Sequence, residues 1–371
     1  MRFHTFGLLT KVVLIMASGS AWAVVPPKVA VTVRPDPVYI EKSGGSQYLV
    51  FSFELLNSDA KPLDISEMRM RAFDKQGRLL VWDKLDSNGG RRSIEVLGIR
   101  TLETGKAVTV FNPFEQLKTA VPIDHLNYEF DVAGPDGAGG TVSADVKPVE
   151  YQQKTKLILP VAGAELWTYE GPGFYSHHSR IDLADTFSRD VLKLRTNSQR
   201  YALDLVVVDK DGQYAHGDDS KKENWIGLGF PIVAPAAGKV LEVDNNQPDE
   251  MQFDPDLAAK DQKVFVGNYI VIDHGNGEYS AMGHLKKGSL LVKVGDRVKP
   301  GQVIAQMGRS GMGSGLIHLH YQLQNSPDMF QSEALPIKFS GFRQVGSAVT
   351  QIGRIDPGWL VITDPPGRSA R

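Results

Sequence analysis

Short runs in which apolar and polar residues alternate fill the first part of the chain after its N-terminal segment. Such runs are expected to form strands with one buried face, because successive side chains of a strand point to opposite faces. Glycine-rich turns separate the runs, and none has a convincing helical period. The expected strands lie at residues 29–33, 48–55, 67–73, 108–111 and 126–132. Residues 24–150 are therefore predicted to form an accessory domain, an immunoglobulin-like antiparallel β-sandwich.

The composition excludes several classes of protein. The chain has 371 residues, of which 42% are apolar and 23% charged, and its formal net charge is -2. These values are typical of a globular chain, and this length suggests two domains of roughly 100 to 200 residues each. The near-neutral charge argues against nucleic acid as a partner, because proteins that bind it carry a basic surplus. Since there are no cysteines, any metal ion must be held by His, Asp or Glu.

The first 23 residues are predicted to be a signal peptide. Arg2 is followed by an apolar stretch at residues 6–16, and the segment ends in Ala21-Trp22-Ala23, an A-x-A cleavage site. The alternative, a membrane-spanning helix, needs about 20 apolar residues, and this stretch has about half of them. The mature chain is therefore expected to be periplasmic or extracellular, with no membrane span.

The histidines are unevenly distributed, which points to a metal or acid/base site in the second half of the chain. Seven of the nine fall between residues 177 and 320: His177, His178, His216, His274, His284, His318 and His320. We expect His216 to be exposed in a polar loop and His274 to be a turn residue. His125, in the sandwich region, is expected to lie at the surface.

Three further patterns single out candidate site residues. His318 and His320 alternate with apolar residues, so on a strand their imidazoles would share one face. Asp204 stands in an otherwise apolar strand, where a carboxylate must be paired, hydrogen-bonded or bound to a metal. His284 directly follows Gly283 at the end of an expected strand, a suitable position for an acid/base group.

Taken together, these residues and several glycine-containing turns resemble the lysostaphin and LytM type of zinc metallopeptidase, which cuts peptide bonds in bacterial cell-wall peptidoglycan. The resemblance covers residues 157–339, and the matching pieces are the strand ending at Asp204 and residues 234–238, 267–275, 283–285, 294–304, 308–311 and 318–320. It implies an antiparallel β metallopeptidase domain at residues 156–340, followed by a C-terminal tail at 341–371. The whole chain is thus expected to be all-β.

The resemblance also implies roles for individual residues. In the family an HxxxD motif supplies a His and an Asp ligand, the second His of HxH supplies the third, and a water completes the tetrahedral zinc. Carried over, Asp204 and His320 would bind Zn2+, while His284 and His318 would assist the water and stabilise the oxyanion. The implied reaction is hydrolysis of peptidoglycan peptide crosslinks with the zinc-bound water as nucleophile.

The match breaks at Arg200, which stands four residues before Asp204 where the first histidine ligand belongs. A guanidinium offers no lone pair to a metal. We expect His178 to be the substitute ligand, with His177 as the next candidate. His178 and Asp182 form a literal HxxxD, but the chain that follows lacks the strand-then-turn context. Arg200 itself is expected on the same strand face as Asp204, as an outer partner of the site or a group that binds a substrate carboxylate.

Two alternatives remain open from the sequence. A catalytically degenerate relative would bind peptidoglycan or activate another hydrolase, which Arg200 at the ligand position would explain. A lipoyl-type carrier would explain the similar segments at residues 233–240 and 294–302, but the interval between them has no obvious lysine hairpin. In the peptidase interpretation, the sandwich could hold the enzyme near the wall or near a protein partner.

Overall fold

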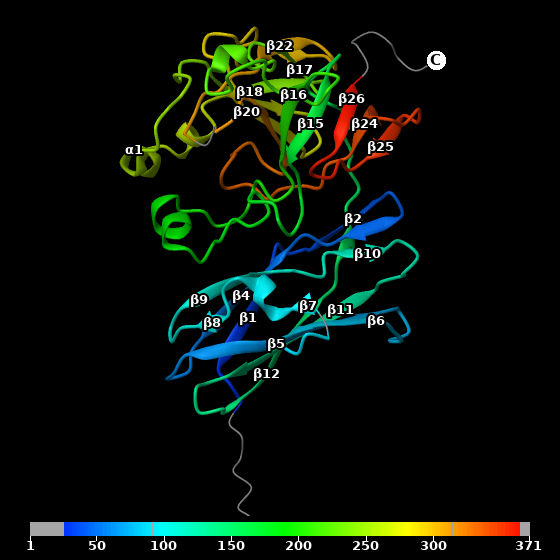
Figure 1. Ribbon diagram of the computed structural model, residues 1–371, viewed down its shortest axis with the longest axis vertical. Coiled ribbons are helices and arrows are strands. Elements are labelled where there is room, and N and C mark those ends of the chain that lie inside the picture. The colour runs from blue at the N-terminus through cyan, green and yellow to red at the C-terminus, as the bar shows by residue number, and fades with distance from the viewer. Residues whose placement is uncertain (1–25, 91, 313–314, 364–371) are drawn as a thin grey trace, which may run out of the picture.

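The computed structural model describes residues 26–90, 92–312 and 315–363, so the predicted signal peptide lies outside the described residues. The described chain forms two units that are stacked along the long axis of the molecule (Figure 1). Nearly all regular structure is β, as predicted. Among the described residues, no helix is long and apolar enough to cross a membrane.

The first unit contains three sheets, with strand orders β1-β4-β9, β10-β3-β2-β13 and β12-β11-β5-β6-β7, and β8 pairs with β5. Its elements are β1 Val29–Arg34, β2 Tyr39–Ser43, β3 Ser46–Tyr48, β4 Ser52–Asn57, β5 Leu63–Phe73, β6 Leu79–Asp86, β7 Arg92–Ser93, η1 Ile94–Leu97, β8 Thr101–Leu102, β9 Ala107–Phe111, β10 Gln116–Lys118, β11 His125–Ala133, β12 Gly139–Val146 and β13 Val149–Glu150.

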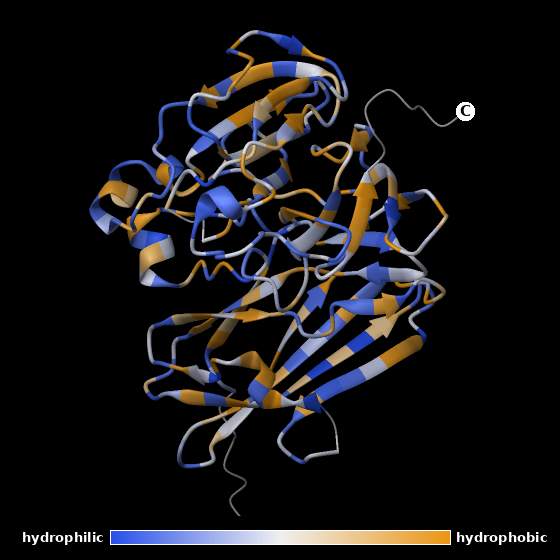
Figure 2. Cartoon of the chain, turned by 45° about the horizontal axis from the view of Figure 1, so that its top comes forward, coloured by the Kyte–Doolittle hydropathy of each residue, from blue (hydrophilic) through white to orange (hydrophobic). Residues whose placement is uncertain are grey.

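Alternation along these strands builds the core of the first unit. Every second residue of β11 is buried, and Figure 2 shows the same alternation of hydropathy along the neighbouring strands. Apolar side chains from all three sheets meet in one cluster. The immunoglobulin-like topology of this unit stays a prediction. The run expected at residues 48–55 is interrupted, because β3 ends at Tyr48 and β4 begins at Ser52, and between them Val50 packs into the core of the other unit.

The second unit is organised around a large sheet with the strand order β14-β24-β26-β15-β16-β23-β20-β19-β18-β21, while β17 pairs with β22 separately. Its elements are β14 Leu157–Ile158, β15 Glu165–Glu170, η2 Phe187–Val191, β16 Leu203–Val208, η3 Lys222–Asn224, β17 Pro231–Val233, β18 Gly238–Asp244, α1 Pro255–Lys260, η4 Gln262–Phe265, β19 Asn268–Asp273, β20 Tyr279–Leu285, β21 Arg297–Val298, β22 Val303–Gln306, β23 Leu319–Gln324, β24 Phe339–Gln344, β25 Gln351–Gly353 and β26 Leu360–Thr363.

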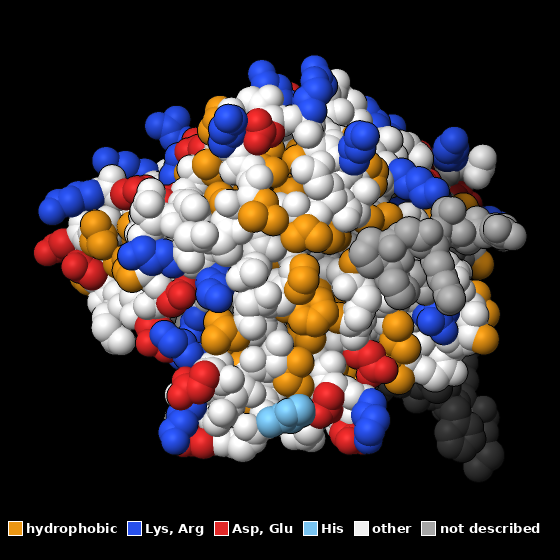
Figure 3. Space-filling view, turned by 90° about the horizontal axis from the view of Figure 1, so that it is seen from above, with side chains coloured by type: hydrophobic (Ala, Val, Ile, Leu, Met, Phe, Trp, Pro, Cys, Tyr) orange, Lys and Arg blue, Asp and Glu red, His pale blue; other side chains and the backbone are white. Residues whose placement is uncertain are grey.

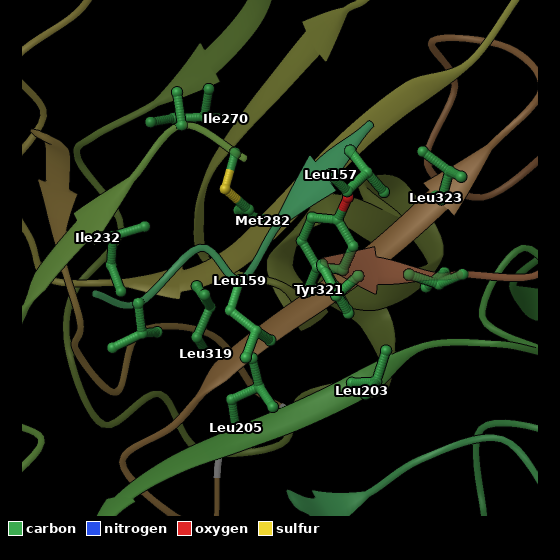
Figure 4. Close-up of a cluster of buried hydrophobic side chains, with 14 of the residues drawn as sticks. Leu157, Leu159, Leu203, Leu205, Ile232, Ile270, Met282, Leu319, Tyr321 and Leu323 are labelled. Atoms are coloured by element: carbon green, nitrogen blue, oxygen red, sulfur yellow. The ribbon is translucent and has the colours of Figure 1, made fainter. Parts of the chain in front are cut away.

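The core of the second unit fixes the position of the central strands. Figure 4 shows Leu203 and Leu205 of β16 beside Leu319 and Tyr321 of β23, with Met282 of β20 nearby. Every residue of β16 and β23 is buried. Because both faces of these strands are covered, polar side chains on them must find partners inside the protein. On the face seen from above, hydrophobic side chains gather near the middle, among charged side chains of both signs (Figure 3).

The sheet continues past the boundary that we expected at residue 340. Strand β24 spans this position, and β24 and β26 lie between β14 and β15 in the sheet. Phe342 and Val361 are both buried in the core. Within the expected tail, the turn at residues 357–358 connects β25 and β26 of this sheet.

A long connection between β15 and β16, residues 171–202, lies between the two units (Figure 1). We call it the connecting segment. Thr109 of the first unit donates a hydrogen bond to Asp182 of this segment at 2.5 Å, and the guanidinium of Arg180 stacks over Phe111 at 4.9 Å. The segment is thus held against both units, and it supplies His177 and His178 to the site described next.

Candidate metal centre

Strand register brings the chain at four of the predicted site residues together. Asp204 on β16 is paired with His320 on β23, and His320 is paired with Gly283 on β20. His284 follows Gly283 directly, and His318 lies just before β23 begins at Leu319. Neighbouring positions on adjacent strands lie about 5 Å apart, so this register places Asp204 and His320 side by side and brings the chain at His284 and His318 close to them.

Asp204 is the common neighbour of three imidazoles. Its Oδ1 lies 3.1 Å from Nδ1 of His320 and 3.4 Å from Nε2 of His318. Its Oδ2 lies 3.6 Å from Nε2 of His178, which reaches the site from the connecting segment. His284 completes the group, with its ring centroid 4.6 Å from that of His318. All five residues are buried, each with at most 5% of its surface exposed.

A chain of amide hydrogen bonds fixes the tautomer of His320. Gln322 uses its Nε2 to donate to Gln324 Oε1 at 2.5 Å and to the carbonyl of Met329 at 3.2 Å. Its Oε1 therefore faces Nε2 of His320 at 2.9 Å and must accept a hydrogen bond from the Nε2–H group. In the neutral ring, Nδ1 of His320 then presents a lone pair to the carboxylate of Asp204. Two acceptors at 3.1 Å need a cation or a proton between them.

His178 shows a second sign of an unsatisfied site. Burial lowers the pKa of His178 to about 3, although the charge of Asp204 opposes this effect. The ring is therefore neutral at pH 7, and its Nδ1 is buried without a hydrogen-bond partner in the described structure. Nε2, which faces Asp204, is available as a ligand atom when the proton is on Nδ1.

Burial and neighbouring charges shift the pKa values of Asp204, His284 and His318 in different directions. Burial disfavours ionisation of Asp204, but the neighbouring histidines, with His178 first, outweigh it and hold its pKa well below the usual value. Burial lowers the pKa of His284, and its proximity to His318 and His320 lowers it further. Burial acts in the same direction on His318, but the charge of Asp204 prevails and raises its pKa.

These donors fit a zinc ion. Neutral imidazoles and an ionised carboxylate, with no thiolate, are a common ligand set for catalytic zinc. Ligand atoms of His177, His178 and Asp204 all lie within 4.8 Å of one another. The side chain of His177 is 62% exposed and is paired with Glu170 at 2.9 Å. His178 is therefore the better placed of the two candidates, since it is buried and has no competing partner.

Backbone contacts explain how His284 is held. Its backbone φ of 59° is in the left-handed region, which residues other than glycine rarely adopt. The strained conformation is stabilised by hydrogen bonds from its backbone N–H to Val266 O at 2.8 Å and from Nδ1 to Ser310 O at 2.7 Å. Nδ1 must donate to the carbonyl, so the Nε2 lone pair of the neutral ring is left free. Strain of this kind is concentrated at functional sites.

The five side chains line a cavity of about 340 Å³ together with further polar and apolar side chains. Serine, threonine and glutamine side chains of the connecting segment also reach it. The apolar lining consists of Ile181, Leu192, Leu194, Phe265, Val266 and Phe330. A cavity with a few convergent polar groups and an apolar wall is typical of a substrate site.

Arg200 does not occupy the position that we expected. It lies in a turn, because β16 begins only at Leu203, and it does not line the cavity. Its side chain is buried, with Nε 3.7 Å from Oε1 of Glu333. The expectation that Arg200 shares a strand face with Asp204 is therefore wrong, and its position gives no support to a contact with a substrate carboxylate.

We expect Arg200→Met to lower the free energy of unfolding by about 2 kcal/mol, because the carboxylate of Glu333, whose side chain is only 22% exposed, would lose its cation. The activity of the molecules that remain folded should change little. Urea unfolding followed by tryptophan fluorescence measures the first quantity, and turnover per folded molecule measures the second. Adding Glu333→Gln should restore part of the stability. Lost turnover with an unchanged unfolding free energy would refute this structural role.

The other histidines behave as expected. His216 is mostly exposed and pairs with Asp209 at 2.9 Å. His274, in the turn after β19, is hydrogen-bonded to Ala237 O and to Ser280, both at 2.8 Å. Neither lines the cavity. Gln322 was not recognised from the sequence, although it continues the every-second-residue pattern of His318 and His320.

Comparisons with known proteins match part of the chain to a family. Residues 226–332 match the model of Peptidase family M23. A peptidoglycan DD-endopeptidase, ShyA, of Vibrio cholerae serotype O1 is 36% identical over 91 residues, which cover 24% of this chain and 20% of the relative. A second one from the same organism, ShyC, is 45% identical over 95 residues, covering 26% of this chain and 17% of the relative. The chain thus spans at most a fifth of the length of these two relatives.

Two solved structures are also similar. LytU is 31% identical, with 29% of this chain and 62% of that chain covered and a TM-score of 0.22. The catalytic domain of lysostaphin from Staphylococcus simulans is 24% identical, with coverage of 33% and 86% and a TM-score of 0.22. The match over residues 226–332 is to an M23 peptidase domain, and the predicted resemblance to lysostaphin-type and LytM-type proteins is confirmed. The matched range includes His284, His318 and His320, whereas Asp204 and His178 precede it.

Proposed function

We propose that this protein is an exported zinc-dependent endopeptidase that hydrolyses peptide crosslinks of bacterial peptidoglycan. The observation that carries the proposal is that His178 and His320 both lie against the carboxylate of Asp204, beside His284 and His318, in a single cavity. The M23 match and the names of the relatives support peptidoglycan as the substrate. Export follows from the predicted signal peptide and from the location of this substrate.

In this proposal His178, Asp204 and His320 hold the zinc ion. When bound, zinc lowers the pKa of a water molecule to about 7 and polarises a carbonyl group. The Nε2 lone pair of His284 accepts a proton from the attacking water, since Nδ1 is fixed by Ser310. His318, with its raised pKa, donates a hydrogen bond from Nε2 to the oxyanion that develops. Each contribution is worth a factor of about 100.

The non-catalytic alternative rested on Arg200 at the first ligand position. His178 approaches Asp204 from the connecting segment, and in this proposal it supplies the third donor in place of residue 200. Arg200 is buried against Glu333, and in this proposal it has no role in metal binding.

Digestion of purified peptidoglycan by the chain starting at Val24 tests the proposal. We expect release of fragments whose masses show cut peptide crosslinks, complete loss of release with a chelator, and recovery when zinc is added back. His216→Ala, which changes an exposed histidine outside the cavity, is the matched control and should cut normally. Absence of cleavage by the folded, zinc-supplied protein would exclude the peptidase function.

A further inference from the structure

A second hollow lies where the two units meet. It consists of two adjoining cavities of about 340 and 530 Å³ that share Glu115, Gln116, Phe174 and Tyr175. The first unit contributes Glu115 and Gln116, and the connecting segment contributes Phe174 and Tyr175. We call the combined hollow the interdomain groove. Boundaries between domains are frequent positions for ligand sites.

Two polar atoms in the interdomain groove lack partners. Ser176 is only 5% exposed, yet its Oγ has no hydrogen-bond partner among the described residues. Oε2 of Glu115 is also buried and unpartnered, while the carboxylate of Glu115 accepts a hydrogen bond from the backbone of Phe174. Buried polar atoms are rarely left unsatisfied, so both point to a ligand that supplies hydrogen-bond donors.

Aromatic rings line the same groove. Tyr175 is 84% exposed and Tyr169 is 43% exposed, which is unusual for side chains of this size. Tyr175 packs edge-on against Phe174, with ring centroids 5.0 Å apart, so its position is supported from one side. A tyrosine ring offers an apolar face together with a polar hydroxyl. The rings and the unpartnered oxygens together match a ligand that has both apolar C–H faces and hydroxyl or amide donors.

The charges in the groove disfavour an anionic ligand. Arg354 lines it, but its guanidinium is already bound by Glu41 at 2.8 Å and by Asp356 at 2.6 Å. Arg92 is paired with Asp83 at 2.5 Å. A peptide with free carboxylates would meet the unpartnered Glu115 without a free arginine to neutralise it, whereas a neutral sugar carries no such cost.

The groove is connected to the metal centre. Glu170 lines the groove and forms an ion pair with His177, which lines the cavity of the metal centre. In the proposal that follows, a polymer that extends from the groove past Glu170 reaches the site where we propose that its peptide is cut.

We propose that the interdomain groove binds the glycan strand of the substrate, a β-linked N-acetylhexosamine oligomer, while the peptide attached to that strand enters the metal centre. The proposal rests on the proposed function, because it assigns the sugar part of the same substrate to a second subsite. In it, the ring of Tyr175 stacks on a sugar face, and Glu115 and Ser176 accept hydrogen bonds from hydroxyl or amide groups.

Binding of chitotetraose, an N-acetylglucosamine tetramer, to the full mature chain tests the subsite independently of catalysis. Isothermal titration should show saturable binding, weakened about tenfold or more by Tyr175→Ala and largely restored by Tyr175→Phe, which keeps the ring. Ile352→Ala changes a residue of similar exposure outside the groove and should leave binding unchanged. Undetectable binding to the wild type, or equal binding to wild type and Tyr175→Ala, would overturn the proposal.

A cleavage assay separates this inference from the proposed function. The ratio of kcat/KM on intact peptidoglycan to kcat/KM on a glycan-free crosslinked peptide should fall at least about fivefold in Tyr175→Ala. An unchanged ratio would refute the role of the groove in catalysis and leave the peptidase proposal standing. A protein that cuts neither substrate but binds chitotetraose through Tyr175 would refute the peptidase proposal alone.

Discussion

Asp204→Ala is expected to lower kcat/KM for peptidoglycan crosslinks by at least about a thousandfold. Asp204 is the only carboxylate among the proposed ligands and the common neighbour of His178, His318 and His320. Its removal takes away both a ligand and the charge that raises the pKa of His318. Metal analysis of the purified protein and initial rates of crosslink cleavage measure the two consequences.

Two further variants sharpen this prediction. Asp204→Asn keeps the size of the side chain but removes its charge, and it should lose nearly as much activity as the alanine variant. Asp209→Ala removes an aspartate that also pairs with a histidine, His216, but lies outside the cavity, and it should stay active. An active Asp204→Ala protein, or an inactive Asp209→Ala protein with a normal fold, would contradict the assignment.

His178→Ala is expected to weaken zinc binding by at least about a hundredfold and to reduce cleavage in parallel. The reason is that His178 is a buried, neutral histidine whose Nε2 faces Asp204. It comes from the connecting segment and not from the strands β16, β20 and β23. Zinc titration of the metal-free protein against a competing chelator gives the affinity. Circular dichroism confirms that the variant is folded.

The adjacent histidine provides the matched control for this prediction. His177→Ala should keep zinc affinity within a few-fold of the wild type, because His177 is largely exposed and engaged with Glu170. If the loss of zinc affinity is larger in His177→Ala than in His178→Ala, the ligand has been assigned to the wrong residue. A small loss in both variants would mean that the third ligand is neither histidine.

The sequence predicts the site well where short-range periodicity determines geometry. The alternation around His318 and His320 places both rings on one side of their chain segment, and both contact Asp204. The isolated carboxylate in an apolar strand is equally informative, since burial forces it to find partners. For the same reason, the β structure of both units is predictable from their short runs and turns.

The sequence alone does not predict which residue completes the site. His178 lies 26 residues before Asp204 in a connecting segment with little regular structure, and its position depends on contacts with both units, such as that between Thr109 and Asp182. Arg200 was misplaced because the apolar run 201–208 suggested a longer strand, whereas the turn at residues 198–201 directs its side chain to Glu333. The positions of His178 and Arg200 both depend on packing between residues far apart in the sequence, which local sequence patterns do not predict.

Anomalous diffraction at the zinc edge, from crystals of the mature chain grown with zinc, tests the central claim most directly. The account predicts one strong peak between the side chains of His178, Asp204 and His320. A peak between His177 and Glu170 instead would contradict this prediction. So would the absence of a peak in the cavity when zinc is bound at other positions in the same crystal.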